Sequence, residues 1–230
     1  MAKYSKTIVV LANSRKISGR CIAGKTIQTN GTIGDWIRPV SSRQAGELSE
    51  KERQFSDGTD PKLLDVVEIQ MHKPVPHGYQ TENHEIDDKV HWVLKRKATA
   101  ADVKSALDTS ASILWDNSAP DTANGKNDRV DDATAAKLKG SLLLIEIPKL
   151  TVSISIEGAG FSNAKRKVRG AFKFRNVDYI LMITDPVVER EYLKKTDGQY
   201  DAGPATLCIS LGELFQGYAY KLIAGVIFPK

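Results

Sequence analysis

The chain has 230 residues and a mass of 25.3 kDa, with 41% hydrophobic and 27% charged side chains. This composition excludes wholesale disorder, collagen and coiled coils, and the length suits one large domain or two small ones. Apolar runs such as those at residues 142–145 and 179–183 are far shorter than the roughly 20 residues that cross a bilayer. The polar N-terminus lacks an apolar signal core, so we expect a cytoplasmic protein with no membrane partner.

The charge is only mildly basic overall but is concentrated in one place. Lys and Arg number 33 against 28 Asp and Glu, which gives a formal net charge of +5. Residues 165–175 hold six cations and no acid, so this stretch creates a local positive field and predicts an anionic partner. Cys21 and Cys208 lie far apart in a chain long enough to build a core, which favours buried thiols over a disulfide.

The first 95 residues alternate between β-rich runs and turn signals. Residues 7–12 predict a strand that ends at Asn13 and Ser14, and residues 20–28 predict a second strand that ends at the tight-turn pair Asn30-Gly31. Residues 35–40 predict a third strand, followed by a long surface loop over residues 41–61. Residues 63–69 and 90–94 predict two more, which makes five strands.

The pattern changes at Thr99, where apolar residues recur with the helical period as far as residue 114. Thr99 predicts the helix cap, and Asp102 lies in the first turn, where a carboxylate complements the helix dipole. Residues 118–132 predict a solvated loop, and residues 133–138 a short helical turn. Five further strands are predicted at residues 141–157, 168–175, 178–184, 205–211 and 218–228.

The predicted fold class is therefore all-β with a helical insert. Five short strands on each side of the insert are typical of a small Greek-key barrel, so we expect two OB-like five-stranded barrels. The predicted domains are a first barrel over residues 1–95, a helical insert and loop over 96–139, and a second barrel over 140–230. The two halves show no sequence repeat.

Four short strings are spread along most of the chain: Ser14-Arg-Lys16 after the first strand, Trp36-Ile-Arg-Pro-Val40, Thr184-Asp-Pro186, and Cys208-x-Ser-Leu-Gly-Glu213 leading to Tyr220-Lys-Leu-Ile223. In these strings the chain resembles the bacterial dual OB-containing domain family. The resemblance implies a pair of OB-like barrels and binding of nucleic acid or nucleotides, in phage-defence or mobile-element loci. It implies no established reaction and assigns no catalytic residue.

The residues themselves point to an anionic ligand in the second barrel. Cations alternate with aromatic rings between residues 161 and 175, a combination that supplies charge for phosphates and ring faces for bases in a single-stranded groove. The alternative is that Phe172 and Phe174 point inward on a strand whose other face is solvated. The rings of this stretch are Phe161, Phe172 and Phe174, and the candidate binding side chains are Lys167, Arg169, Phe172 and Lys173.

The first barrel offers a second set of candidates. Ser14, Arg15 and Lys16 follow the first strand on a predicted loop and can clamp a phosphate, unless they are simply a solvated loop. Trp36 and Arg38 share one face of a strand, where they can stack a base and hold its phosphate. The alternative is a core Trp36 with Arg38 packed across it. From the second barrel, Lys221 completes the predicted binding residues.

Metal, cofactor and catalytic signals are weak. The histidines, at 72, 77, 84 and 91, lack the tight pairs of a zinc site, and no phosphate loop or dinucleotide motif occurs, so we expect neither metal nor cofactor. The leading function is noncatalytic binding of single-stranded nucleic acid or a nucleotide. The alternative is an enzyme acting on them through Asp128, Asp185 or Glu213, although Asp185 before Pro186 also suits a turn or cap. A protein-interaction module of a defence system is the third possibility.

Overall fold

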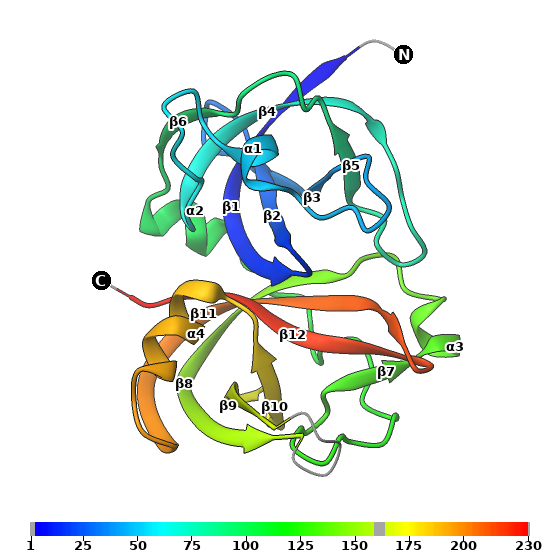
Figure 1. Cartoon of the computed structure of the whole chain (residues 1–230), viewed down its shortest axis with the longest axis vertical. Coiled ribbons are helices and arrows are strands. Elements are labelled where there is room, and N and C mark those ends of the chain that lie inside the picture. The colour runs from blue at the N-terminus through cyan, green and yellow to red at the C-terminus, as the bar shows by residue number, and fades with distance from the viewer. Residues whose placement is uncertain (1–2, 159–163, 230) are drawn as a thin grey trace. The chain divides into compact units, whose positions relative to one another are not determined.

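The computed structural model describes residues 3–158 and 164–229 (Figure 1). The chain divides into two compact units, the first made of Met1–Leu107 and Lys139–Ser141 and the second of Asp108–Leu138 and Leu142–Lys230. The predicted insert over residues 96–139 is thus not a unit of its own. Its first part belongs to the first unit, and most of the remainder belongs to the second.

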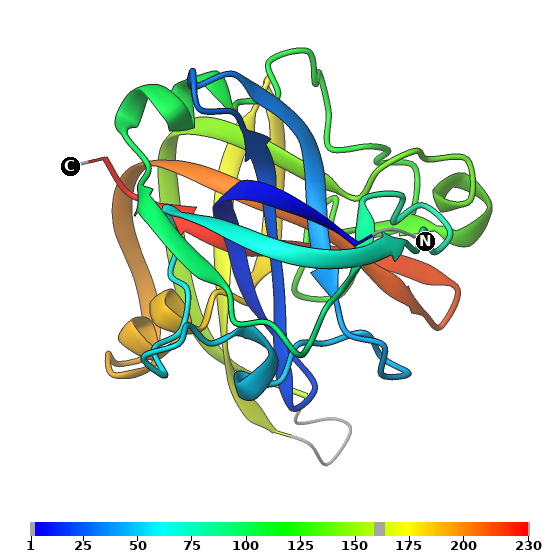
Figure 2. The same ribbon diagram turned by 90° about the horizontal axis from the view of Figure 1, so that it is seen from above.

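The first unit is a β-barrel whose ring contains five strands (Figure 2). The ring runs β1-β2-β3-β5-β4 and closes by the antiparallel pairing of β1 with β4; β3 and β5 are parallel, and β6 is added beside β4. Its core holds mainly aliphatic side chains together with Phe55 and Trp92. The elements are β1 (Tyr4–Lys16), β2 (Gly19–Ile27), β3 (Ile33–Val40), α1 (Glu50–Arg53), β4 (Asp65–Pro74), β5 (Asn83–Ile86), β6 (Val93–Lys97) and α2 (Ala100–Ser105).

Two differences from the sequence prediction arise in this ring. The expected loop at residues 13–16 is wrong, because β1 continues to Lys16 and pairs with β2, with Ser14 opposite Cys21 and Arg15 opposite Arg20. Polar residues are tolerated there because a partner strand satisfies their backbone groups. Strand β5, with the sequence Asn-His-Glu-Ile, was not predicted, since its polar residues carry no β signal and its pairing with β3 is set by ring closure.

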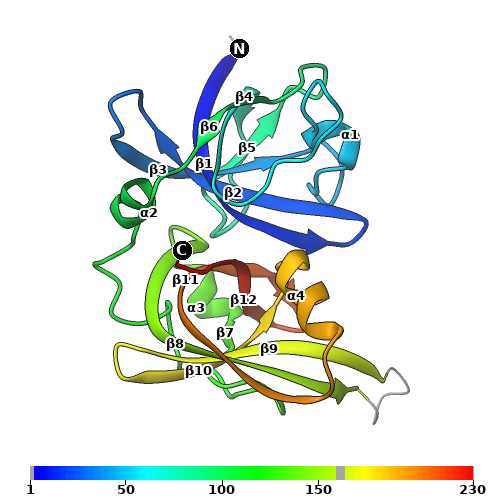
Figure 3. The same cartoon turned by 90° about the vertical axis from the view of Figure 1, so that its left-hand side faces the viewer.

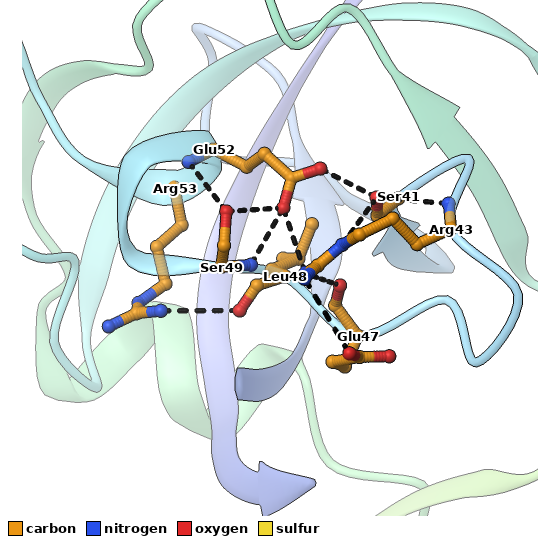
Figure 4. Close-up of polar contacts among 7 residues, drawn as sticks. All are labelled: Ser41, Arg43, Glu47, Leu48, Ser49, Glu52 and Arg53. Atoms are coloured by element: carbon orange, nitrogen blue, oxygen red, sulfur yellow. Dashed lines mark hydrogen bonds and ion pairs between the residues drawn. The ribbon is translucent and has the colours of Figure 1, made fainter. Parts of the chain in front are cut away.

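The long connection between β3 and β4 is ordered by a cluster of polar contacts around Glu52 (Figure 4). The Ser49 side chain caps α1, and the Glu52 carboxylate accepts hydrogen bonds from the Ser49 amide at 2.7 Å and the Ser41 hydroxyl at 2.6 Å. Arg43 pairs with the same carboxylate at 3.0 Å. Burial opposes the charge, but the hydrogen bonds from Ser41 and Ser49 and the positive charge of Arg43 hold the pKa of Glu52 below its ordinary value.

The second unit repeats the ring connectivity of the first. Its ring runs β8-β9-β10-β12-β11 and closes by the pairing of β11 with β8; β10 and β12 are parallel, and β7 is added beside β12. Both rings therefore place their strands in the chain order 1-2-3-5-4, with a helix between the third and fourth, and the prediction of two OB-like five-stranded barrels is confirmed. The elements are β7 (Arg129–Asp131), α3 (Asp132–Ala135), β8 (Leu142–Glu157), β9 (Lys165–Phe174), β10 (Val177–Ile183), α4 (Pro186–Leu193), β11 (Gly198–Phe215) and β12 (Tyr218–Ile227).

The helices are shorter than the sequence suggested. Thr99 and Asp102 form the expected cap, but α2 ends at Ser105, whereas the helical period extends to residue 114. The apolar spacing in the sequence extends beyond the helix because Leu114 is fully buried in the core of the second unit. Residues buried in two different units therefore give what looks like a single helical pattern. Helix α4 was not predicted, although Asp185 is its N-cap and Pro186 occupies its first turn. No helix within residues 3–158 and 164–229 has the length and apolar character to span a membrane.

Candidate functional site

The predicted binding residues of the first unit lie in different surroundings. Ser14 is buried and its hydroxyl donates to the Cys21 carbonyl at 3.4 Å, while Arg15 is exposed at the end of the β1–β2 hairpin. Trp36 is half-buried in β3 opposite Lys25, whose Nζ lies 5.2 Å from the centre of the Trp36 ring system. Lys16, the third residue of the predicted phosphate clamp with Ser14 and Arg15, is half-buried.

Arg38 lies in the interior of the first unit, not on its surface. Its side chain is 3% exposed and pairs with Glu82 at 3.1 Å. The guanidinium also donates to the Ser141 hydroxyl at 2.7 Å and to the Asn83 amide oxygen at 3.3 Å. This burial favours the structural interpretation of Arg38, whose guanidinium binds side chains inside the unit.

Strand β9, the yellow strand labelled in Figure 3, places Phe172 and Phe174 on one face and Lys167, Arg169 and Lys173 on the other, as period-2 alternation requires. Phe172 is 6% exposed and belongs to the core, where it stacks on Tyr179 with 5.5 Å between ring centres. Lys173 lies on the other face and is exposed. The structure thus favours the core interpretation of Phe172, and Phe161 lies outside the described residues.

The three arginines among the six cations between residues 165 and 175 donate hydrogen bonds to other parts of the second unit, and Arg175 does so to the Thr109 carbonyl at 3.2 Å. Arg169 is 8% exposed, and two of its nitrogens donate to the Glu157 carboxylate at 2.7 and 3.0 Å. Arg166 binds the carbonyls of Leu193 and Lys195, at the C-terminal end of α4. The remaining cations include Lys173, which is exposed, and Lys167, which is half-buried.

A groove of about 390 Å³ lies over β8, β9 and β10. Thr151, Ala171 and Ile180 form one row across the three strands, because Thr151 pairs with Ala171 and Ala171 with Ile180. Lysines from three different segments, Lys126, Lys149 and Lys173, also line the groove. An apolar floor with positive side chains around it is therefore built from β8, β9, β10 and the segment that precedes β7.

The groove lysines are held only loosely by acids. Lys126 and Lys173 lie 3.5 and 3.7 Å from Asp178, and Lys149 lies 3.0 Å from Asp201. The three lysine side chains are 47%, 60% and 64% exposed. Ion pairs this exposed contribute little free energy, so the ammonium groups can exchange a carboxylate for a phosphate.

The segment that precedes β7 extends this surface towards β12. Lys126 and Ile180 exchange two backbone hydrogen bonds of 3.1 Å, and the Asn127 side chain donates to the Asp178 carbonyl at 2.9 Å. Arg129 then enters β7, where it lies opposite Tyr220 of β12. The basic groove and the β11–β12 hairpin are therefore joined through residues 126–129.

Aromatic rings gather on that hairpin. Phe215 is 62% exposed, and its ring centre lies 6.4 Å from that of Tyr220. The Arg129 guanidinium carbon lies 3.9 Å above the Tyr218 ring. Sequence reasoning missed these rings, as well as Lys126, Lys149 and Arg129. The available signal was the alternation Tyr218-x-Tyr220 directly after the Gln216-Gly217 turn, where alternate residues share a face.

Lys221 lies on the opposite side of β12 from these tyrosines and is 1% exposed. Its ammonium donates to the Asp116 carbonyl and, at 2.7 Å, to the Asn117 amide oxygen. Burial lowers its pKa from 10.5 to about 8, although the negative charges of Asp116, Asp128 and Asp121 oppose the shift. The predicted role of Lys221 as a direct ligand contact does not fit a side chain so deeply buried.

The acids considered for catalysis lie in different surroundings. The Asp185 carboxylate accepts from the amides of Val187 and Val188 at the start of α4 and from the Val226 amide. Asp128 is 4% exposed, and its carboxylate accepts from the amide and hydroxyl of Thr122. Glu213 is exposed on β11. The contacts of Asp185 favour its interpretation as a cap, and those of Asp128 hold the turn at Thr122.

Two of the histidines each lie beside a different side chain. His72 lies 3.7 Å from Asp87, and the Nδ1 atom of His84 lies 2.5 Å from the Tyr4 hydroxyl. In the part of the chain that the structure describes, no three His, Cys, Asp or Glu side chains come together as metal ligands would. Cys21 and Cys208 are free thiols, and Cys208 is fully buried.

The comparison with known families gives one match, and it covers almost the whole chain. The profile of the dual OB-containing domain matches residues 6–226. No curated protein and no solved structure matches the chain.

Proposed function

This chain belongs to the dual OB-containing domain family, and we propose that its second unit binds single-stranded nucleic acid. The observation that carries the proposal is the continuous surface from the lysine-lined groove over β8, β9 and β10 to the exposed rings of the β11–β12 hairpin. OB-folds often bind nucleic acids, and the face formed by the second and third ring strands with the loop between the fourth and fifth is their usual binding surface. In this unit those elements are β9, β10 and the β11–β12 turn.

The chemistry of the surface suits a single strand better than a duplex. Exposed lysines neutralise phosphates regardless of sequence, while Phe215 and Tyr220 offer ring faces to bases that are not paired. A duplex hides its base faces, so rings of this kind would gain nothing from it. A free nucleotide would meet either the groove or the hairpin, whereas a polymer meets both.

The experiment is a titration of a fluorescent single-stranded oligonucleotide at several salt concentrations. Three lysine–phosphate contacts predict a slope of about −2 for the logarithm of the association constant against the logarithm of salt concentration. Lys173→Ala and Lys126→Ala should each weaken binding and flatten that slope by about 0.7. The control is Lys194→Ala, because the Lys194 side chain is 66% exposed beside α4 and is no part of the groove.

Binding that does not change between about 50 and about 200 mM salt would contradict the proposal, as would no binding at the lower concentration. Competition separates the ligands: a mononucleotide that displaces the oligonucleotide at equal concentration would point to a nucleotide site. The bacterial cytoplasmic setting, the phage-defence or mobile-element context and protein partners in a defence system stay predictions from the sequence.

A further inference from the structure

One residue of β12 holds both ends of the segment formed by residues 116–128. The backbone amide of Lys221 donates to the Asp128 carbonyl at 2.9 Å, at the C-terminal end of the segment. The ammonium of the same residue donates to the Asp116 carbonyl and to the Asn117 side chain, at the N-terminal end. The fully buried Lys221 therefore closes this segment into a loop fixed on the barrel wall.

Hydrogen bonds cross-link the segment between its two ends. The Asp128 carboxylate accepts from the Thr122 amide at 3.1 Å and from the Thr122 hydroxyl, and the Gly125 amide donates to the Thr122 carbonyl at 3.2 Å. A Cβ atom added to Gly125 would lie 1.9 Å from an oxygen of Asp128, so the turn is too tight for any other residue. The segment is therefore attached to the barrel at two places, at its ends through Lys221 and near its C-terminal end through the contacts of Lys126 and Asn127 with β10.

The segment presents part of the proposed ligand surface. Lys126 lines the groove, and Arg129, directly after the segment, stacks on Tyr218 and donates to the Pro120 carbonyl at 2.6 Å. If the ends were released, only contacts such as the Lys126–Ile180 and Arg129–Tyr220 pairings would still hold these two cations beside β10 and β12. The buried ammonium of Lys221 can thus affect the positions of Lys126 and Arg129 on the ligand surface although it does not itself contact the ligand.

We propose that Lys221 is a positioning residue of the nucleic-acid surface: it keeps the segment of residues 116–128 closed, and Lys126 and Arg129 meet the ligand only in the closed form. This inference rests on the proposed function, because it assigns the regulation of the same surface. A ligand that binds only the closed form also stabilises it, so ligand binding and segment closure are coupled.

The proton on Lys221 gives the coupling a pH dependence. The groups facing its ammonium are Asp116, Asp121 and Asp128 of the segment and the ring of Tyr179 on β10, whose centre lies 5.6 Å away. Burial in the closed form lowers the pKa to about 8, whereas an opened segment returns the ammonium to water and to its ordinary value of 10.5. The closed form therefore binds fewer protons between these values, and closure becomes more favourable as the pH rises through that window.

Hydrogen exchange of the amides in residues 117–128, followed by mass spectrometry on the full chain without ligand, tests the closure directly. Lys221→Met, which leaves two acceptors without their donor, should speed exchange in the segment by about tenfold. The matched control Lys194→Met removes an exposed lysine and should leave exchange unchanged. After correction for intrinsic rates, the protection of the segment should rise from pH 7.5 to 9.5 in the unmodified protein and stay flat in Lys221→Met.

Asn117→Asp provides a second test, which applies even if Lys221→Met fails to fold. The new carboxylate beside the ammonium favours the charged form, so the rise in protection should move to higher pH. A rise at unchanged pH would show that another group titrates, and equal exchange in Lys221→Met and the unmodified protein would overturn the proposal.

Oligonucleotide affinity supplies the second readout. Lys221→Met should weaken binding by about tenfold, because the closed form is less populated. Lys126→Ala should weaken binding without faster exchange, and adding it to Lys221→Met should cost less than the sum of the two single changes. If no oligonucleotide binds the unmodified protein, the proposed function fails while the exchange measurements still decide the role of Lys221. Additive losses of affinity would overturn the coupling.

Discussion

Arg38 and Glu82 form an ion pair inside the first unit, 3.1 Å apart, with side chains 3% and 5% exposed. Ser141 joins them, since its hydroxyl accepts from Arg38 at 2.7 Å and donates to the Glu82 carboxylate. The pair therefore connects β3 to the residue before β5 and to a serine about a hundred positions further along the chain. Two opposite charges are thus buried within ion-pair distance of one another.

Arg38→Met is expected to destabilise the protein, because it leaves the Glu82 carboxylate buried without a cation. Breaking a buried pair from one side costs about 3 to 5 kcal/mol of unfolding free energy, which chemical denaturation can measure. The double change Arg38→Met with Glu82→Gln should recover part of this loss. A variant of normal stability with weakened oligonucleotide binding would instead place Arg38 at the ligand.

Phe172 and Phe215 should respond in opposite ways to truncation. Phe172→Ala removes a ring that is 6% exposed and should cost about 3 to 5 kcal/mol of stability. Phe215→Ala removes a ring that is 62% exposed, so stability should barely change, while oligonucleotide affinity should fall by about 1 to 3 kcal/mol. Thermal unfolding measures the stability of both variants, and oligonucleotide titration measures their affinity. A Phe215→Ala protein that binds normally would show that the hairpin is not part of the ligand surface.

Asp185→Ala is expected to lower the unfolding free energy of the protein and to have no other effect. The change deprives the Val187 and Val226 amides of their acceptor and removes the N-cap of α4, at a cost of about 2 kcal/mol in unfolding free energy. Asp185→Asn should keep most of the stability, since Asn is a good N-cap residue. Loss of a nucleic-acid-processing activity in Asp185→Asn, with stability retained, would revive the enzyme interpretation.

Asp102 should make the first unit sensitive to acid. Hydrogen bonds from Arg96, opposed by burial and supported by the amide and hydroxyl of Thr99, hold the pKa of Asp102 well below its ordinary value of 3.8. Because the folded value is the lower one, the stabilisation is complete above about pH 4 and is lost as the pH falls further. The difference in unfolding free energy between the unmodified protein and Asp102→Asn should therefore be constant between pH 7 and pH 5 and should shrink steadily as the pH is lowered below 4. A difference that stays constant below about pH 4 would contradict this assignment.

Much of the fold is encoded locally and could be predicted. Thr99 and Asp102 form their cap within four residues, and Asp185 before Pro186 marks the start of α4. Most strands lie where β-branched residues gather. Strand β5 could not be predicted, because its pairing with β3 follows from ring closure and not from its own residues.

The candidate site was predicted only in outline. The cations of residues 165–175 led to the second unit and to β9, but the partners of Arg166 and Arg169 come from other elements of the tertiary structure. The rings of the surface come from the β11–β12 hairpin instead of from β9, where Phe172 belongs to the core. Alternation separates the faces of a strand, but it does not say which face is the interior.

The sequence by itself determined two β-barrels, their family and a basic stretch in the second of them, because β propensity, turn residues and local charge are properties of neighbouring residues. Only the tertiary structure decided which of those residues meet water. Arg38 and Lys221 look like surface cations in the sequence, yet both are buried beside partners far away in the chain. A buried charge is stable only where such partners converge, and that convergence depends on how the whole chain folds.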